Sequence, residues 1–190
     1  MRRLGTRPPP AGALAGPSPC VTVNRAPVLT LWAAVVAERL GFDRDEALTM
    51  GRVVAGLNAY TKGRSLGIFK PVPEAVRRER SRLAPDTVLH IALLHRAVPL
   101  VQTPEGLRAL AKGKPVSPDS VQRYLESRFG AALGAVEDAM NALARSLPVE
   151  DLAHRAFELY EAFRPEVAAG VRGWGAAAPL SLARIRAAAH

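Results

Sequence analysis

The stretch 103–147 constrains the fold of this chain most, because its prolines and glycines fix where helices can begin and end. Thr103 followed by Pro104 has the pattern of a helix N-cap with proline at the first helical position. Gly113 then offers a residue that commonly follows the end of a helix. The pattern predicts a short helix over 104–112, closed by a tight basic turn.

A second and longer helix is predicted over 118–147. Ser117 and Pro118 repeat the pattern of cap and proline, and Asp119 suits the positive end of the helix dipole. Apolar residues then recur at helical spacings: Val121, Leu125, Ala132, Val136, Ala139 and Leu143. Such a stripe can bury against a neighbouring helix or a symmetry mate, so this helix is also the candidate interface of a homodimer.

Helix, glycine-containing turn and helix form a helix-turn-helix unit, with a buried helix over 86–98 as its support. In such a unit the first residues of the second helix contact the edges of bases. Arginine can form two hydrogen bonds with guanine, and glutamine can form two with adenine. We therefore predict base contacts for Ser120, Gln122 and Arg123 and phosphate contacts for the turn lysines, Lys112 and Lys114. The alternative is an ordinary helical bundle whose exposed face carries these residues.

The N-terminal part predicts an arm followed by a helical hairpin. Residues 1–26 are rich in proline, glycine and alanine and contain arginine but no acid, which predicts a disordered basic arm. From Pro27 the apolar residues follow helical spacing up to Gly41. Asp43 and Glu46 then have the spacing of a capping box, which predicts the start of a second helix.

The densest positive block of the sequence lies between Thr61 and Leu83. Its prolines and glycines make the first half a loop, and a loop with interspersed cations can follow a phosphate backbone. The predicted nucleic-acid contacts of this block are Lys62, Arg64, Lys70, Arg77 and Arg78. A solvated linker between two helical layers explains the same residues equally well.

The C-terminal part predicts one more long helix, over 149–163, with Glu150 and Asp151 in its first turn. A glycine-rich loop after it presents Arg172 and Trp174, which can anchor a partner or stack on a base. A tryptophan folded back onto the bundle is the alternative. The last residues, 181–190, predict a short helix.

The charge of the chain favours a polyanionic partner. Its 190 residues carry a formal net charge of +9, while 48% of them are hydrophobic and 23% charged, which is typical of a soluble globular protein. A positive excess favours nucleic acid first and an anionic membrane surface second. A basic protein without a polyanionic partner is the alternative.

The residues predict no catalytic, metal or cofactor site. No pattern places a general base beside an oriented partner, His90 and His95 lack the spacing of metal ligands on one helix face, and no phosphate-binding loop occurs. Cys20 is the only cysteine, which is typical of a reducing cytoplasm. The longest apolar run, Leu31 to Ala37, is far shorter than the roughly 20 residues that span a bilayer. We expect a cytoplasmic protein that is not an enzyme and has no membrane partner.

Two segments resemble an uncharacterised family of bacterial helical proteins. These are LTLWAAVVAERLGFDRDEALTMG, at Leu29–Gly51, and FRPEVAAGVRGWG, at Phe163–Gly175. The resemblance implies an all-helical cytoplasmic protein and assigns no site residues.

Together these patterns predict an all-α multi-helix bundle that contains a helix-turn-helix-like unit, behind the disordered arm. Residues 27–83 form the helical hairpin and the basic loop, and residues 84–190 the helical domain, with one compact domain over 27–190 as the alternative division. The predicted function is binding of nucleic acid, double-stranded DNA first, by a regulator or chromosome-associated protein. A helical protein-interaction or adaptor module without nucleic-acid binding is the second hypothesis.

Overall fold

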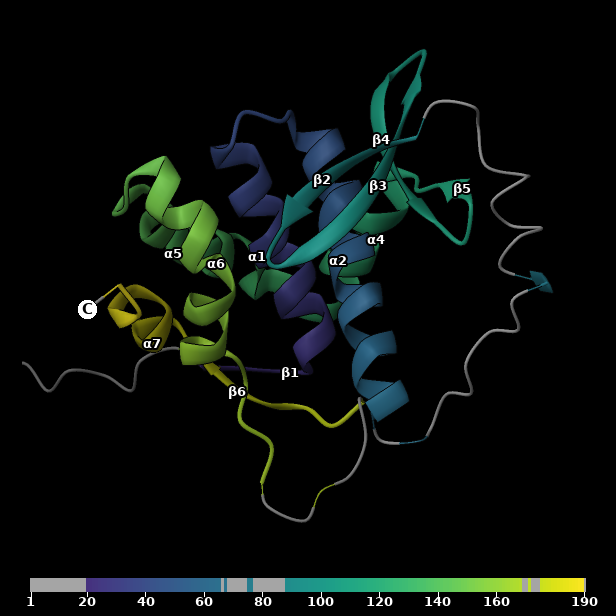
Figure 1. Cartoon of the computed structure of the whole chain (residues 1–190). Helices are drawn as coiled ribbons and strands as arrows, with labels where there is room; N and C mark the ends of the chain where they lie inside the picture. Colours follow the sequence, from purple (N-terminus) through teal and green to yellow (C-terminus); the bar gives the residue numbers. More distant parts are fainter. Residues whose placement is uncertain are drawn as a thin grey trace, which may run out of the picture.

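A computed structural model describes residues 20–65, 67, 75–76, 88–168, 171 and 175–189 of the chain. In chain order its elements are β1 (Cys20–Val23), α1 (Arg25–Arg39), α2 (Arg44–Ser65), β2 (Leu89–Leu93), β3 (Arg96–Thr103), β4 (Gly106–Ala111), β5 (Lys114–Pro115), α4 (Pro118–Phe129), a 3-10 helix (Gly130–Ala132), α5 (Leu133–Arg145), α6 (Val149–Phe163), β6 (Ala178–Ser181) and α7 (Leu182–Ala187). The strands form two sheets, β1-β6 and β2-β3-β4-β5 (Figure 1). The fold is mixed α/β, so the all-α prediction is wrong.

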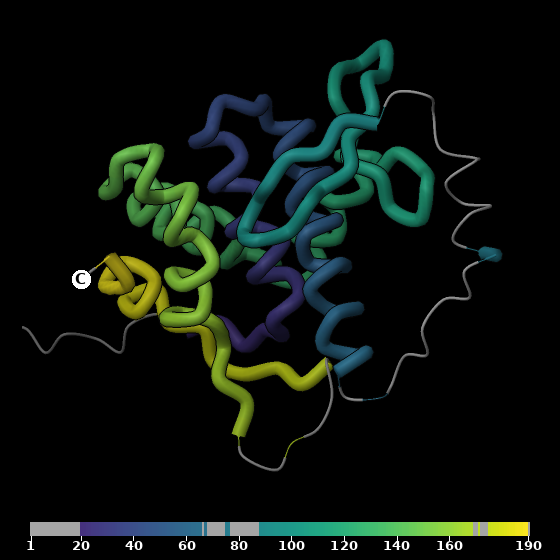
Figure 2. The backbone as a smooth tube through the Cα atoms, viewed as in Figure 1, coloured from purple at the N-terminus to yellow at the C-terminus, as the bar shows by residue number. Residues whose placement is uncertain are grey.

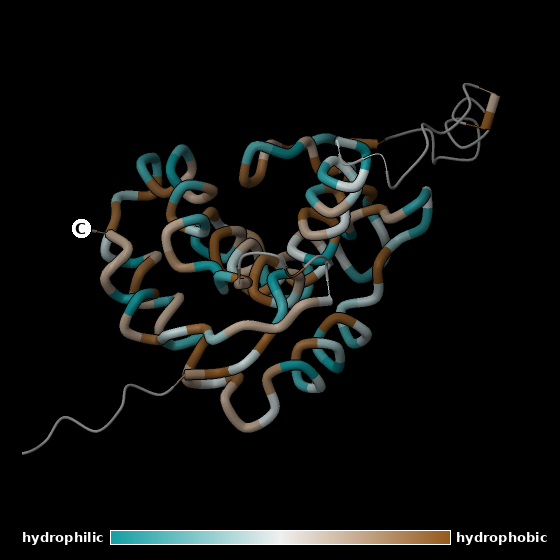
Figure 3. Tube along the Cα trace, turned by 90° about the horizontal axis from the view of Figure 1, so that it is seen from below, coloured by the Kyte–Doolittle hydropathy of each residue, from teal (hydrophilic) through white to brown (hydrophobic). Residues whose placement is uncertain are grey.

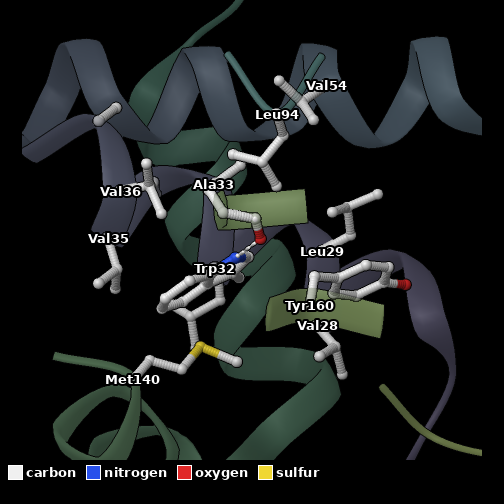
Figure 4. Close-up of a cluster of buried hydrophobic side chains, with 14 of the residues drawn as sticks. Val28, Leu29, Trp32, Ala33, Val35, Val36, Val54, Leu94, Met140 and Tyr160 are labelled. Carbon is white, nitrogen blue, oxygen red and sulfur yellow. Dashed lines mark hydrogen bonds between the residues drawn. The ribbon is translucent and has the colours of Figure 1, made fainter. Parts of the chain in front are cut away.

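The helix α1 lies at the centre of the molecule. Every residue from Pro27 to Ala37 is buried, and the helix packs against α2, α4, α5 and α6. Trp32 lies in the middle of this core, with Met140 and Tyr160 close to it (Figure 4). Its indole N–H donates a hydrogen bond of 2.7 Å to the carbonyl oxygen of Ala156 in α6. A helix buried on all sides in this way anchors the elements around it.

The predicted helical hairpin is confirmed, because α1 and α2 follow each other across a short turn and pack together. The capping box is confirmed as well. A carboxylate oxygen of Asp43 accepts the N–H of Glu46 at 2.8 Å, and a carboxylate oxygen of Glu46 accepts the N–H of Asp43 at 3.3 Å. The two helices cross closely at Gly51, where a Cβ atom would lie 2.2 Å from the carbonyl oxygen of Thr30.

The four-stranded sheet is an antiparallel meander joined by two-residue turns. The β2–β3 turn consists of Leu94 and His95, which both adopt positive φ angles, 46° and 59°. The β3–β4 turn holds Pro104, and Gly106 directly after it has a φ of 113°. The β4–β5 turn is Lys112-Gly113, again with both φ angles positive. Positive φ at both turn residues matches the right-handed twist of hairpin strands.

The helices predicted over 86–98 and 104–112 are therefore wrong, and the helix-turn-helix unit that they would form with the next helix is not present. Pro104 is as well suited to the second position of a β-turn as to the start of a helix, and glycine is common at the end of such a turn. Leucine rarely adopts a positive φ, so the turn at Leu94 gives no signal in the sequence. The burial of its side chain, 2% exposed, stabilises that turn.

Two side chains of α2 bind β4 along the part of its edge that precedes the short pairing with β5. A carboxylate oxygen of Glu46 accepts the backbone N–H of Leu107 at 3.0 Å. One turn further along, the hydroxyl oxygen of Thr49 accepts the N–H of Ala109, also at 3.0 Å. These bonds satisfy strand donors that pair with no other strand, so α2 takes the place of a neighbouring strand at this edge.

The single long helix predicted over 118–147 is interrupted. The predicted cap is confirmed, because the hydroxyl oxygen of Ser117 accepts the N–H of Ser120. The helix α4 then ends at Gly130, whose φ of 54° is unfavourable for residues with a Cβ, and α5 begins after one 3-10 turn. The predicted apolar stripe is largely buried in the core of the same chain, at Val121, Leu125, Val136, Ala139 and Leu143.

The β1-β6 sheet joins the two ends of the described fold at the bottom of Figure 1, with Cys20 opposite Ser181. The disordered arm is predicted over 1–26, and for residues 20–26 this prediction is wrong; residues 1–19 lie outside the described residues. The predicted helix over 149–163 is confirmed by α6, and the predicted last helix by α7. Figure 2 traces the path of α6 and α7 as a backbone tube. Figure 3 colours the backbone of the chain by hydropathy, and hydrophilic and hydrophobic residues alternate along the tube.

Candidate functional site

The strongest candidate site is a tyrosine that two arginines flank at the surface, which we call the Tyr124 cluster. The guanidinium carbon of Arg52, on α2, lies over the ring of Tyr124 at 4.6 Å from its centroid. The guanidinium carbon of Arg128, one turn along α4 from the tyrosine, lies at 5.6 Å. Tyr124 is half-buried and both arginines are exposed. Within the described ranges neither guanidinium forms an ion pair with a carboxylate.

One side of α4 carries no acid. A helix turns by about 100° per residue, which places five polar or aromatic side chains in one continuous arc: Ser120, Arg123, Tyr124, Ser127 and Arg128. The acids of this helix, Asp119 and Glu126, both fall outside the arc. The buried residues Val121, Leu125 and Phe129 hold the helix so that the arc faces solvent. This arc of α4 therefore presents cations and hydroxyl groups, and the two acids stand at its border, four residues before and three residues after Arg123.

The opposite flank of α4 is occupied by an ion-pair network. Arg44 donates to Glu38 at 2.7 Å and pairs with Glu137 at 2.6 Å. The same guanidinium donates to the amide oxygen of Gln122 at 3.5 Å, and the amide N–H of Gln122 donates to a carboxylate oxygen of Glu126 at 2.9 Å. Burial lowers the pKa of Arg44, but the hydrogen bond to Glu38 and the charge of Glu137 outweigh it, so the net shift of this pKa is upward. The charges on this flank are therefore largely compensated within the fold.

The turn between β4 and β5 adds two more cations beside α4. Lys112 and Lys114 flank the turn glycine and are exposed. After β5 the chain passes through Val116 into the cap of α4, so this turn immediately precedes the acid-free arc. The bonds from Glu46 to Leu107 and from Thr49 to Ala109 also show that α2 and β4 run side by side in the same direction. Along this shared direction, Arg52 lies three residues beyond Thr49 on α2, and Lys112 lies three residues beyond Ala109, just after the end of β4.

The surface at Gly56 adjoins Arg52. Gly56 lies one helical turn further along α2 and is exposed, and no atom of the described residues lies within 4 Å of the position that its Cβ would take. Alanine or a larger residue would stand beside the guanidinium of Arg52 at this point. Among the described residues, the space directly beside Gly56 is therefore free for a ligand that contacts this part of α2.

The described structure brings together some of the predicted contact residues and separates others. Ser120 and Arg123 lie exposed on the acid-free arc, as do Lys112 and Lys114 in the adjoining turn. Gln122 lies on the other flank of α4, where its amide bonds to Glu126. Lys62 and Arg64 are exposed in the last turn of α2. The remaining predicted contacts lie outside the described residues: Lys70, Arg77, Arg78, Arg172 and Trp174.

Sequence reasoning missed the three residues of the Tyr124 cluster. The spacing of Tyr124 and Arg128, four residues apart on a predicted helix, was a usable signal for a contact between them. Arg52 gave no such signal, because only the packing of α2 against α4 brings it to the tyrosine.

Among the residues that the structure describes, no group of three or more histidine, cysteine, aspartate or glutamate side chains is arranged to hold a metal ion. In the same part of the chain, no helix combines the length and the apolar character needed to cross a bilayer. Comparisons with models of protein families, with curated proteins and with solved structures gave no match to this chain. Function must therefore be argued from the geometry of the site.

Proposed function

We propose that this protein binds nucleic acid through its basic face, which we define as Arg52, Lys112, Lys114, Arg123 and Arg128. The observation that carries the proposal is the Tyr124 cluster, because it joins Arg52 of α2 to Arg128 of α4, and among the described residues neither guanidinium forms an ion pair with a carboxylate. Cations that have no carboxylate partner are available to phosphate groups. The net charge of +9 adds a field that attracts a polyanion over a longer range.

The arginines of this face are suited to phosphate. A guanidinium presents several N–H donors in a plane, so that it can bind two phosphate oxygens at once. Stacking on a ring restricts the rotamers of a long side chain and lowers the entropy that binding would cost. The guanidinium carbons of Arg52 and Arg128 lie 4.6 Å and 5.6 Å from the centroid of the Tyr124 ring, within the range of such a contact. The hydroxyl groups of Ser120 and Ser127, on the same arc, are further donors to phosphate or sugar oxygens.

Double-stranded DNA is the ligand that a helix-turn-helix unit would favour, because such a unit reads base edges in the major groove. The structure removes this reason to prefer double-stranded DNA, since the segment before α4 is a β-hairpin and not a helix. What supports nucleic-acid binding now is the collection of cations on three elements. Lys62 and Arg64, at the exposed end of α2, extend the positive character of that helix.

The test is a salt titration of binding by the full chain to a fluorescein-labelled oligonucleotide of mixed sequence. We expect the triple variant Lys112→Gln, Lys114→Gln, Arg123→Gln to bind more weakly, because it removes three cations that would bind phosphates. Each phosphate that is no longer neutralised should also flatten the dependence of log K on log salt by roughly 0.7 to 0.9. These three side chains are exposed, so the variant should fold as the parent does.

A matched control removes the same charge from other surfaces. Arg145, Arg155 and Arg186 are exposed on α5, α6 and α7, and their triple glutamine variant also lowers the net charge from +9 to +6. We expect the control to retain most of the affinity and the salt slope of the parent. Equal losses in both variants would mean that binding follows net charge alone. A parent that binds no oligonucleotide at low salt would refute the proposal, and the adaptor hypothesis would then come first.

Two further predictions belong with this proposal. We place the protein in the cytoplasm, because its single cysteine is typical of a reducing compartment.

A homodimer through the segment 118–147 also stays a prediction. Because the apolar stripe of that segment is buried in its own chain, such a dimer would have to use the exposed residues of α4 and α5.

A further inference from the structure

We infer that the Tyr124 cluster recognises unpaired nucleic-acid strands, by stacking bases on the guanidinium planes of Arg52 and Arg128. This inference rests on the proposed function and names its ligand class. It concerns the chemistry of the cluster, because phosphate binding alone requires positive charge and does not require an aromatic ring between two arginines.

The two guanidinium groups are planar surfaces that face a ring on one side. Arg52 lies over the Tyr124 ring, and Arg128 lies within 6 Å of the same centroid. A guanidinium stacks on aromatic rings through its flat face, which an ammonium group cannot do. Since both arginines are exposed, each has surface left for a second planar group. Unpaired bases stack on aromatic side chains and on arginine planes in this manner.

A duplex cannot use this feature. Its bases are stacked on each other inside the helix, so their flat faces are hidden and only base edges and phosphates meet the protein. A single strand exposes its base faces and has a backbone flexible enough to bring them to a small platform. The contribution of the planes should therefore appear for single strands and be absent for duplexes.

The surroundings of the cluster have room for such a strand. The surface beside Arg52 is bare at Gly56, where no atom of the described residues would contact an added Cβ. Ser127 stands next to Tyr124 on the arc, and its hydroxyl donates at 2.9 Å to the carbonyl oxygen of Tyr124 while its oxygen stays available as an acceptor. The cations at Lys112 and Lys114 lie on the adjoining turn, where the backbone of a strand leaving the platform can meet them.

In this arrangement Tyr124 is a positioning residue. The bases would lie on the arginine planes, and the Tyr124 ring, within 6 Å of both guanidinium carbons, would keep these side chains in place. Replacing each arginine by lysine removes the planar guanidinium and keeps the positive charge, so this substitution tests the role of the planes directly.

The test compares the double variant Arg52→Lys, Arg128→Lys with the parent protein. The probes are a 20-nucleotide single strand of mixed sequence, as DNA and as RNA, and the DNA duplex of the same sequence. We expect the lysine variant to lose about 5-fold or more in affinity for the single strand, the lower end of what one stacked base contributes. Its affinity for the duplex and its salt slope should stay as in the parent, because both charges remain. The DNA and RNA arms then distinguish which kind of unpaired strand is preferred.

Two further variants make the result decisive. Arg145→Lys with Arg155→Lys changes two exposed arginines outside the basic face, for which the described part of the chain shows no ring contact, and should bind both probes as the parent does. Tyr124→Leu keeps an apolar side chain against the core and removes the ring, and should reproduce the selective loss for the single strand. The thermal unfolding of each variant verifies that it is folded.

The outcomes separate this inference from the proposed function. If the Arg52 and Arg128 lysine variant binds the single strand as tightly as the parent, or loses single strand and duplex equally, the inference is wrong. The proposed function would still stand if the basic-face glutamine variant weakened both probes. If the parent binds neither probe at low salt, both fail together.

Discussion

Two glycines of α2 lie on opposite sides of the helix, and the same substitution should affect them in opposite directions. At Gly51 a Cβ would lie 2.2 Å from the carbonyl oxygen of Thr30, so α1 and α2 would have to move apart. We expect Gly51→Ala to lower the free energy of unfolding by about 1–3 kcal/mol or more, as overpacking in a core does. At Gly56 the space is open, and Gly56→Ala should raise it by up to about 1 kcal/mol through helix propensity.

Urea unfolding of the two variants beside the parent measures both effects. Each variant is the control of the other, since both make the same chemical change in the middle of one helix. A Gly51→Ala variant as stable as the parent would mean that α1 and α2 can separate at this crossing at little cost.

At this same scale the sequence predicted individual residues unevenly. The capping pair of Asp43 and Glu46 and the cap at Ser117 were predicted correctly, because local spacing alone determines such hydrogen bonds. The residues of the candidate site were not. Gln122 was predicted to read bases and instead bonds to Glu126, while Arg52 was overlooked. Contacts between distant elements leave no local pattern that sequence reasoning can detect.

Among the elements, α2 and β4 are joined in part by the carboxylate of Glu46. Glu46 caps its own helix and also accepts the N–H of Leu107. We expect Glu46→Ala to lower the free energy of unfolding by about 1–3 kcal/mol, because the half-buried N–H of Leu107 loses its acceptor and α2 loses one bond of its capping box. The amide of Leu107 should then exchange its hydrogen faster, as measured by NMR.

A matched control uses Glu158, which is exposed on α6. Glu158→Ala should leave both the stability and the exchange of the Leu107 amide close to those of the parent. Thr49→Val offers a second check, since it removes the acceptor of the Ala109 amide while keeping the side-chain volume. Unchanged exchange at Leu107 in Glu46→Ala would show that another group protects this amide.

The elements that the sequence predicted correctly are the ones with strong local signals. The helices α1, α2 and α6 have apolar spacing, caps or acids in the first turn, and all three were predicted. The hairpins were missed because their strands are short and their turn signals are ambiguous. Pro104 suits a helix start and a turn alike, and the apolar run around Leu94 suits a buried helix and two paired strands alike. The pairing of adjacent strands and the packing of this sheet on α2 decided the outcome, and the spacing of apolar residues does not report either of them.

For the molecule as a whole, the buried Tyr160 makes stability depend on pH at the alkaline end. Burial raises the pKa of Tyr160 to about 12 from its ordinary 10.0, although the charges of Arg164 and Arg25 lower it. The unfolded chain therefore loses this proton at lower pH than the folded one. Stability from this group is fully present below pH 10 and is lost as the pH rises through about 12. The loss amounts to about 2–3 kcal/mol, at about 1.4 kcal/mol per pH unit.

Urea unfolding at pH 9 and at pH 11.5 tests this expectation. The variant Tyr160→Phe keeps the ring among Phe157 and Phe163 and removes the ionisable group. Within the described part of the chain the Tyr160 hydroxyl donates one long hydrogen bond, of 3.4 Å, to the carbonyl oxygen of Arg25, so the variant should be close to the parent in stability at pH 9. At pH 11.5 it should be the more stable of the two. The same decline in both proteins would contradict the assignment to Tyr160.

The pairing of β1 with β6 has a consequence for how the chain folds during its synthesis. The ribosome releases Cys20 long before Ser181, the residue opposite it in the sheet. Until then β1 has no partner, and the central helix that follows it gains the cover of α4, α5 and α6 only as these later helices emerge. A contact between residues so far apart in the sequence forms late, because a long loop must close first. A nascent chain released too early would therefore expose the most apolar helix of the protein, α1, and we expect such fragments to aggregate or to be recognised by chaperones.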